Sequence, residues 1–226
     1  MIQILILAVF IAFEANASLI DTIVANGVPR DAAEVAFQKL ELFQAQVKNP
    51  NYMAIIDFRQ HSGQKRFYLI NRSTGAVESM AVAHGTASDP QKNGYAQYFS
   101  NVPNSKMSSL GAYLVAEQYK GKHGASVRLD GLESTNSNVR NRAIVLHPAD
   151  YVKDTKSKQG WSWGCPALPQ SHMASAIAKL EGEAFMYAFG VNAYRETAAD
   201  RFELEMAKKP GYQWVNEAEE APFMGD

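Results

Sequence analysis

The sequence changes from a helical pattern to a strand-like pattern near residue 51, and this change limits the fold more than any other feature. Residues 18–50 read as helical with a break at 26–30, because apolar side chains after the break recur mainly at three- and four-residue steps. Beyond residue 51, short runs rich in β-branched and aromatic residues alternate with glycine, asparagine and proline turns. Periodicity alone therefore indicates a chain of mixed α and β structure.

The strand-like runs extend over most of the remaining chain. They are predicted at residues 52–58, 66–70, 76–83, 112–115, 126–129, 143–146 and 183–189. The first two runs, with the short connection between them, predict a hairpin. A helix is predicted over 171–180. The polar stretch 85–109 is longer than most loops of compact domains, which is typical of a functional or mobile segment.

Length and composition indicate one globular domain with additions at both ends. The 226 residues are 46% apolar and 20% charged, which excludes disordered, collagen-like and coiled-coil chains. We divide the chain into a signal peptide at 1–17, a helical segment at 18–50, a catalytic domain at 51–190, and a helix and tail at 191–226.

The first residues resemble an export signal. Residues 2–13 are almost all apolar, and a helix of that length would span about 18 Å, less than the ~30 Å hydrocarbon core of a bilayer. The small residues Ala15 and Ala17 then frame a cleavage site. No Lys or Arg precedes the run, so a buried N-terminal helix is the alternative. We expect a periplasmic or otherwise exported protein without a stable membrane span after cleavage.

Charge and cysteine content exclude several classes of partner and site. Lys and Arg number 22 against 23 Asp and Glu, so no basic excess supports a nucleic-acid partner. The single cysteine, Cys165, can form no internal disulfide and no cysteine-cluster metal site. An unpaired thiol in an exported protein is either a reactive group or a small buried hydrophobe.

The neighbours of Cys165 bear on that choice. Gly164 permits a strained turn or a close approach of the backbone to a ligand, and Pro166 restricts the backbone directly after the thiol. A thiol on such a turn, near backbone amides, is suited to act as a nucleophile beside an oxyanion site. Turn geometry alone does not separate this from a structural cysteine.

A cysteine nucleophile needs a base, and two of the five histidines are placed to supply one. His147 closes the apolar run 143–146, and His84 closes a second run and precedes a glycine. His61, His123 and His172 are expected in solvated turns or near a helix start.

The order of these residues resembles a known family. His147 followed by Ser162-Trp163-Gly164-Cys165 is similar to the catalytic signature of the L,D-transpeptidases of the YkuD type, Ser-x-Gly-Cys with an upstream histidine. The surrounding sequence more closely resembles the murein L,D-transpeptidase catalytic domain family. The matching segments are 82–85, 99–101, 108–111, 119–124, 129–133 and 162–169.

The resemblance implies a fold, a substrate and a reaction. The fold would be mainly β, a YkuD-like β-sandwich catalytic domain with flanking α-helices. The substrate would be peptidoglycan stem peptides, and the reaction an acyl transfer through a thioester on the cysteine. No cofactor and no metal are implied. Hydrolysis of the same thioester, an L,D-carboxypeptidase activity, stays open.

The resemblance also assigns roles residue by residue. Cys165 would be the nucleophile and His147 its base, while Gly164 would lie in the oxyanion turn and Ser162 would support the site. The group that orients His147 is open between Asp150, Ser162 and a backbone carbonyl, and we favour the last two.

Two departures from the common YkuD pattern bear on substrate binding. Trp163 replaces a His or Arg before the glycine, and Pro166-Ala167 replaces an aliphatic residue followed by Arg. We therefore predict that at least one of Trp161 and Trp163, with Trp163 as the first candidate, holds the substrate by contact area rather than by a charge pair. His84 is a second candidate for substrate contact, and Arg142 is the candidate for a basic anchor.

Two other classes of protein are alternatives. A zinc peptidase would use His84, His123 and His147, but no His-Glu-x-x-His spacing supports it. A non-catalytic wall-binding module on the same fold is disfavoured by the presence of both Cys165 and His147.

Overall fold

The computed structural model describes residues 16–193, 200 and 204–206. Residues 1–15 of the predicted signal peptide lie outside these ranges, as does most of the predicted C-terminal helix and tail. Both stay predictions. Among the described helices, none combines the length and the apolar character needed to cross a bilayer.

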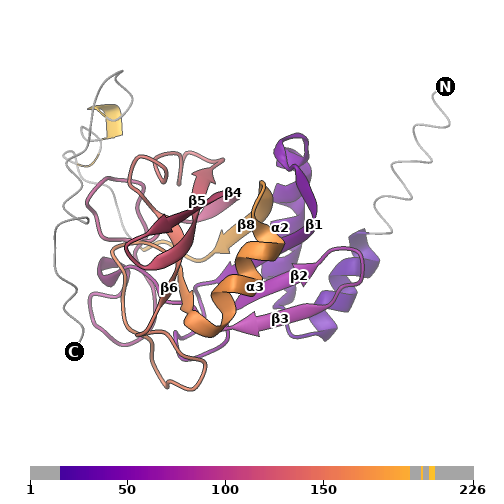
Figure 1. Cartoon of the computed structure of the whole chain (residues 1–226), viewed down its shortest axis with the longest axis horizontal. Coiled ribbons are helices and arrows are strands. Elements are labelled where there is room, and N and C mark those ends of the chain that lie inside the picture. The colour runs from indigo at the N-terminus through magenta and orange to yellow at the C-terminus, as the bar shows by residue number, and fades with distance from the viewer. Residues whose placement is uncertain (1–15, 194–199, 201–203, 207–226) are drawn as a thin grey trace.

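Eight strands form the centre of the molecule (Figure 1). They are β1 (Asn49–Asp57), β2 (Phe67–Asn71), β3 (Val77–Met80), β4 (Gly111–Gly121), β5 (Gly124–Gly131), β6 (Val145–Ala149), β7 (Ala167–Pro169) and β8 (Ala184–Phe189). Their hydrogen-bonded order is β3-β2-β1-β8-β4-β5-β6-β7. The pairs β1–β8 and β6–β7 are parallel and the others antiparallel. The predicted hairpin of β1 and β2 and the mainly β fold with flanking helices are confirmed.

Helices cover both faces of the sheet. A helical segment over residues 16–25 and α2 (Arg30–Phe43) pack on one face, and α3 (Gln170–Leu180) packs on the other. Figure 1 shows α3 crossing in front of the strands. Two short 3₁₀ turns complete the elements, η1 (Gln44–Gln46) and η2 (Thr86–Ser88).

The residues of β1 show why this strand reads as one continuous apolar run. Met53 and Ile55 belong to the core beneath α2, whereas Ala54 and Ile56 belong to the core beneath α3. Alternate residues of a strand point to opposite faces, so a strand covered on both faces is apolar throughout. These two cores fix the sheet on which the candidate site is built.

Strand boundaries differ from prediction where the backbone has a special conformation. β6 begins two residues later than predicted because Ala143 adopts a left-handed φ of 52°. The shift moves His147 from the end of the strand to its middle. β7 was not predicted, since it has three residues and ends in proline. β3 ends early, and single bridges from Ala83 to Ala167 and from Gly85 to Ser162 follow it.

The long polar stretch 85–109 contains only η2 as regular structure but is largely buried. The carboxylate of Asp89 accepts hydrogen bonds from the amides of Asn93 and Gly94. The hydroxyl of Ser88 accepts one from the amide of Ser108. These bonds fold the stretch on itself. The hydroxyl of Ser108 and the amide of Thr86 then join it to the cysteine segment, by donating to the carbonyl oxygens of Gly164 and Ser162.

Candidate active site

The cysteine turn is built around Gly164. Its φ is 125°, a conformation that favours glycine. A Cβ added there would lie 2.7 Å from the carbonyl oxygen of Met107 and 2.9 Å from Cδ1 of Ile144. The carbonyl oxygen of Gly164 also accepts a hydrogen bond from the hydroxyl of Ser108, at 3.0 Å. The turn therefore sits closely against the stretch 85–109, and only glycine fits at this position.

Ser162 forms hydrogen bonds within the turn. Its hydroxyl donates to the carbonyl oxygen of Cys165 at 2.6 Å and accepts from the amide of Gly164 at 3.1 Å. Its own amide donates to the carbonyl oxygen of His84, and its carbonyl oxygen accepts from the amide of Thr86. The amide of Gly164 is thus engaged by Ser162 and does not face an open site in this conformation.

The thiol of Cys165 is half-buried against the strand that carries His147. The amide of Val145 lies 3.5 Å from Sγ as a donor, and Sγ lies 3.8 Å from the carbonyl oxygen of Ala143, to which it donates. Burial raises the pKa of the Cys165 thiol, while the Val145 amide and the positive charge of Arg142 oppose this shift. The free protein therefore holds a protonated thiol near neutral pH.

The imidazole of His147 is buried and neutral. Nδ1 lies 2.9 Å from the carbonyl oxygen of Pro148, and since a carbonyl only accepts, Nδ1 carries the hydrogen. Nε2 is then the basic nitrogen. Burial lowers the pKa of His147 to about 4, against the opposing effect of the Pro148 carbonyl. A backbone carbonyl thus orients the ring, one of the two arrangements favoured from sequence.

The strand register brings Cys165 and His147 to neighbouring positions. His147 pairs with Ala167 in the parallel β6–β7 ladder, and its amide donates to the carbonyl oxygen of Pro166 at 3.4 Å. The thiol rests on Val145, two residues before His147. Among the described residues, no hydrogen bond joins the thiol to the imidazole. The two groups therefore lie on neighbouring segments, and the described residues hold no preformed ion pair between them.

His123 stacks on His147, a contact that sequence reasoning missed. It lies in the turn between β4 and β5, and its ring centroid is 4.5 Å from that of His147, with 27° between the ring planes. Burial and the charge of Lys122 lower the pKa of His123. The turn was expected from the flanking glycines, but the stacking depends on the pairing of β5 with β6, which no local pattern encodes.

His84 lies beneath the cysteine segment rather than on an open surface. Its side chain is 1% exposed. Nδ1 accepts a hydrogen bond from Nη2 of Arg66 at 2.7 Å, and Nε2 lies 3.7 Å from a carboxylate oxygen of Asp89. Burial lowers the pKa of His84 to about 4. These contacts suit a positioning residue, because its backbone carbonyl receives the amide of Ser162. Arg66, fully buried, was not predicted as part of this network.

Arg142 is engaged by the chain itself. Nη1 donates to the carbonyl oxygen of Ser100 and the hydroxyl of Ser109, both at 2.7 Å. Nη2 donates to the hydroxyl of Ser105 at 3.1 Å and the carbonyl oxygen of Met107 at 2.7 Å. Burial lowers the pKa of Arg142 to about 10. With both terminal nitrogens occupied, its contacts are those of a residue that holds the stretch 100–109 in place.

The two tryptophans before the cysteine differ in exposure and partners. Trp163 is 37% exposed, and Nζ of Lys106 lies 4.5 Å from its ring centroid. Trp161 directs Nε1 toward a carboxylate oxygen of Asp89 at 3.3 Å. Trp163 is therefore the indole available at the surface, as its predicted role in substrate binding requires.

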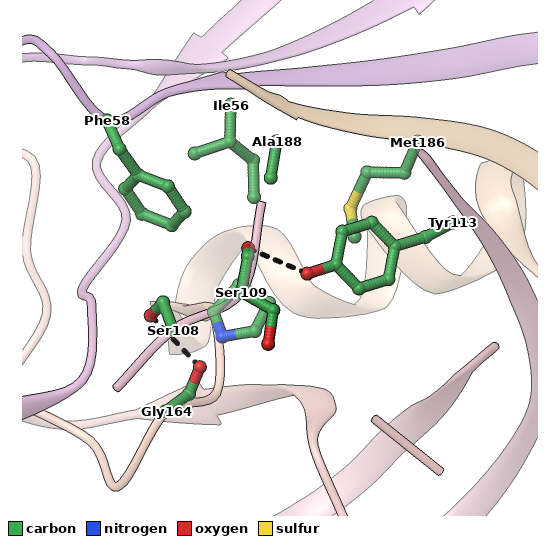
Figure 2. A pocket seen from close by; sticks show the side chains of 9 residues that line it. Ile56, Phe58, Ser108, Ser109, Tyr113, Gly164, Met186 and Ala188 are labelled. Atoms are coloured by element: carbon green, nitrogen blue, oxygen red, sulfur yellow. Dashed lines mark hydrogen bonds between the residues drawn. The ribbon is translucent and has the colours of Figure 1, made fainter. Parts of the chain in front are cut away.

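A small cavity of about 10 Å³ lies behind the turn (Figure 2). It is enclosed by apolar side chains of the sheet and by the hydroxyls of Ser108 and Ser109. In Figure 2 Ser108 donates to the carbonyl of Gly164, and Tyr113 donates to the carbonyl of Ser109. A space of this size holds about one water molecule. This cavity is therefore too small to hold a peptide.

A zinc site would need at least three ligating side chains close together within residues 16–193, 200 and 204–206. In that part of the chain, no three His, Cys, Asp or Glu side chains are grouped as a metal site would require. Of the three histidines in the zinc alternative, His123 and His147 stack, whereas His84 contacts Arg66 and Asp89.

The buried neutral His147 leads to a prediction about acid stability. The pKa of His147 in the folded protein, about 4, lies below the ordinary 6.5. Between pH 4 and pH 6.5 this imidazole is therefore protonated in the unfolded chain and neutral in the folded one. The neutral His147 therefore contributes about 3 kcal/mol to the unfolding free energy, for a pKa shift of this size. This contribution is present in full above pH 6.5 and is lost as the pH falls through 4. We expect His147→Asn to reduce the decline of unfolding free energy between pH 7.5 and 4.5.

Urea unfolding at several pH values measures this decline. A residual decline should persist in His147→Asn, because His84 carries a similar shift. His172→Asn, at a partly exposed position, is the control and should keep the decline of the unaltered protein. If His147→Asn and the unaltered protein lose stability equally, His147 is not buried in its neutral form.

Comparison with known proteins gives the family. A sequence model described as the L,D-transpeptidase catalytic domain matches residues 24–189. No curated protein matches the chain. Similar solved structures include an L,D-transpeptidase from Mycobacterium smegmatis, at 11% identity and a TM-score of 0.39, covering 62% of this chain and 59% of that one. L,D-transpeptidase 3 from Mycobacterium tuberculosis shows 12% identity and a TM-score of 0.42, with 62% of each chain covered.

A further similar structure is Bd1075 from Bdellovibrio bacteriovorus, at 12% identity and a TM-score of 0.37, covering 72% of this chain and 55% of that one. The chain thus spans less than two thirds of the length of each of these three structures. The assignment rests on the family match, which extends from the helical segment before α2 to the end of β8. The chain belongs to the L,D-transpeptidase catalytic domain family.

Proposed function

We propose that this protein is a cysteine-dependent L,D-transpeptidase that acts on peptidoglycan stem peptides, in the periplasm or otherwise outside the cytoplasm. The observation that supports the proposal is the β6–β7 ladder. It pairs His147 with Ala167, two residues after Cys165, while the Cys165 thiol rests on Val145, two residues before His147. A family member with a thiol and a base so arranged has the two groups that acyl transfer through a thioester requires.

The first step is a proton transfer coupled to attack. Because the thiol has a raised pKa and the imidazole a lowered one, we favour general-base transfer at the moment of attack over a resident ion pair. Sγ gives its proton to Nε2 of His147 and forms a bond to the carbonyl carbon of an L,D peptide bond near the D-end of the stem. The carbonyl oxygen becomes an oxyanion.

The oxyanion needs donors, and one such donor is typically worth about 3 kcal/mol. The Gly164 amide, which the resemblance points to, is engaged by the Ser162 hydroxyl. The backbone amide of Cys165 is directed toward the sulfur of the same residue. We therefore propose the Cys165 amide as the first donor. The Gly164 amide would join it once the Ser162 hydroxyl, which also donates to the carbonyl of Cys165, moves away and releases that amide.

Collapse of the tetrahedral intermediate completes the acyl-enzyme. The C–N bond breaks, His147 returns its proton to the departing nitrogen, and the terminal D-residue leaves as a free amine. The thioester on Cys165 is then resolved by an amine of a neighbouring stem, which forms a crosslink, or by water, which gives carboxypeptidase activity. In either case His147 accepts the proton of the incoming group.

Mass spectrometry of purified muropeptides after incubation tests the proposal. We expect loss of the terminal D-residue together with a new crosslinked dimer, and a transient mass increase of the protein that matches the acyl group on Cys165. Loss of the residue without a dimer would favour the carboxypeptidase. Binding to sacculi without turnover would overturn the enzyme and favour the wall-binding module.

The general-base route predicts how the free thiol reacts. Alkylation by iodoacetamide follows the thiolate fraction, and burial raises the pKa of Cys165 above the ordinary 9.0. We therefore expect the alkylation rate to keep rising with pH beyond 9, measured by mass spectrometry of the intact protein. A plateau near pH 7 or below would instead show a resident thiolate–imidazolium pair.

A further inference from the structure

We infer that Lys106 and Trp163 form a subsite beside Cys165 that binds a carboxylate of the acyl donor, the one on the D-residue that leaves. The identity of the natural ligand rests on the function proposed above. The subsite itself, a cation held over an exposed indole two residues before Cys165, rests on the geometry of the described residues.

The position of Lys106 is fixed by a strained backbone. Its φ of 55° lies in the left-handed region, which costs a non-glycine residue about 1 kcal/mol or more. Its carbonyl oxygen accepts a hydrogen bond from the amide of Ala87 at 3.1 Å. The same oxygen packs so closely on Gly85 that an added Cβ there would lie 2.4 Å from it. Because Gly85 bridges to Ser162, Lys106 and the cysteine turn are held in one arrangement.

The ammonium of Lys106 is directed over Trp163. Nζ lies 4.5 Å from the ring centroid, a favourable cation–π distance. Among the residues that the structure describes, no carboxylate forms an ion pair with Lys106, whereas the acidic partners of Lys39, Lys48 and Lys179 are all in place. The charge is therefore available to an anionic ligand.

The surroundings reinforce this charge. The segments 85–109 and 151–163, which flank the cysteine turn, carry five lysines and two aspartates. Asp89 accepts hydrogen bonds within the fold, and Asp154 pairs with Lys65 and His172. The chain as a whole has a net charge of −1, so this rim is positive relative to the rest of the molecule. A positive rim raises the local concentration of anionic substrates.

The chemistry of the donor fits the subsite. The D-residue that leaves bears a free carboxylate, one residue beyond the scissile bond, and consecutive Cα atoms are 3.8 Å apart. A flexible ammonium suits a single carboxylate near the thiol, and the indole offers an apolar face to the rest of that residue. Lys106 and Trp163 would together supply part of the substrate contact that an arginine after the cysteine would make in the common YkuD pattern, and which this sequence lacks. The sequence-based expectation that Trp163 acts without a charge is modified accordingly.

Paired alkylating reagents test the subsite without any cell-wall substrate. Iodoacetate and iodoacetamide transfer nearly equal groups to the same thiolate, and only the first is negatively charged. The ratio of their rates at one pH cancels the thiolate fraction and reports the local charge. The variants are Lys106→Met, which removes the charge, and Lys106→Arg, which keeps it. Both substituents carry a Cβ, so the backbone strain is the same in all three proteins.

We expect Lys106→Met to lower the iodoacetate-to-iodoacetamide ratio by up to about threefold, which is the effect that one unit charge at ~6 Å would have in water. Lys106→Arg should keep the ratio, and 1 M salt should lower that of the unaltered protein, because the Debye length then shrinks to about 3 Å. Lys48→Met removes the same charge at an exposed lysine beside Glu183 and should leave the ratio unchanged. An unchanged ratio in Lys106→Met, or an equal fall in Lys48→Met, overturns the subsite.

Donor peptides then identify the ligand. A tetrapeptide whose terminal carboxylate is replaced by a carboxamide should show a raised apparent KM with the unaltered protein, and Lys106→Met should raise it no further. Equal use of both donors overturns the assignment to that carboxylate. If no donor is turned over while Lys106→Met still lowers the alkylation ratio, the proposed function fails and the subsite stands.

Discussion

Cys165→Ala is expected to abolish both loss of the terminal D-residue and crosslinking. Removal of a catalytic nucleophile typically lowers kcat by a factor of a thousand to a million. No second thiol can substitute, because the chain has one cysteine. Cys165→Ser, which keeps a hydroxyl of similar size at the same place, should also be inactive, since a hydroxyl beside His147 lacks the acidity and nucleophilicity of a thiol.

The fold should survive this substitution. The thiol is half-buried at the edge of the core, and its two hydrogen bonds, with the amide of Val145 and the carbonyl of Ala143, are long. The change in unfolding free energy should therefore be about 1 kcal/mol or less. Mass spectrometry of muropeptides gives the activity, and thermal unfolding gives the control. A folded Cys165→Ala protein that still crosslinks would exclude Cys165 as the nucleophile.

Much of the sheet could be predicted because local patterns there agree with the final packing. β1 and β8 are buried on both faces and read as apolar runs of strand length. α2 and α3 are buried on one face and show helical periodicity. The short β7 could not be found, because three residues carry no period, and its pairing with β6 depends on a contact between segments 20 residues apart.

The candidate site was predictable in its residue types but not in its hydrogen bonds. The Gly-Cys-Pro turn and the upstream histidine are local features. The bond that occupies the Gly164 amide and the stacking of His123 on His147 are set by tertiary contacts. Arg142 illustrates the difference best. Its sequence position near His147 suggested a substrate anchor, whereas the fold directs its terminal nitrogens to the stretch 100–109.

This placement of Arg142 predicts a large loss of stability on substitution. Arg142→Leu removes four hydrogen bonds, to the carbonyl oxygens of Ser100 and Met107 and to two serine hydroxyls. It also leaves those buried acceptors without their partner. Hydrogen bonds to charged groups contribute about 1.5–3 kcal/mol each, and breaking a buried charged network typically costs 3–5 kcal/mol. We expect a loss of about 4 kcal/mol, a large part of the stability of an ordinary domain.

Arg140, two residues earlier, is the matched control. It forms ion pairs with Glu117 and Asp130. The side chain of Arg140 is 43% exposed, and those of Glu117 and Asp130 are 56% and 36% exposed. Exposed ion pairs contribute about 1 kcal/mol or less, so Arg140→Leu should change little. Urea unfolding of both variants measures the difference. If the two losses agree within 1 kcal/mol, Arg142 does not hold the stretch 100–109.

The same variant should disturb the cysteine turn, which Arg142 supports both through residues 100–109 and by its own close approach to Gly164. The carbonyl oxygen of Met107, which Arg142 holds, lies against Gly164, and Ser108 donates to the Gly164 carbonyl. Once these residues are released, amides within 100–109 should exchange hydrogen faster, and the Cys165 thiol should lose its fixed position beside His147. Turnover per folded molecule should therefore fall in Arg142→Leu and stay near normal in Arg140→Leu. Normal turnover in a folded Arg142→Leu protein would show that the turn keeps its geometry without this support.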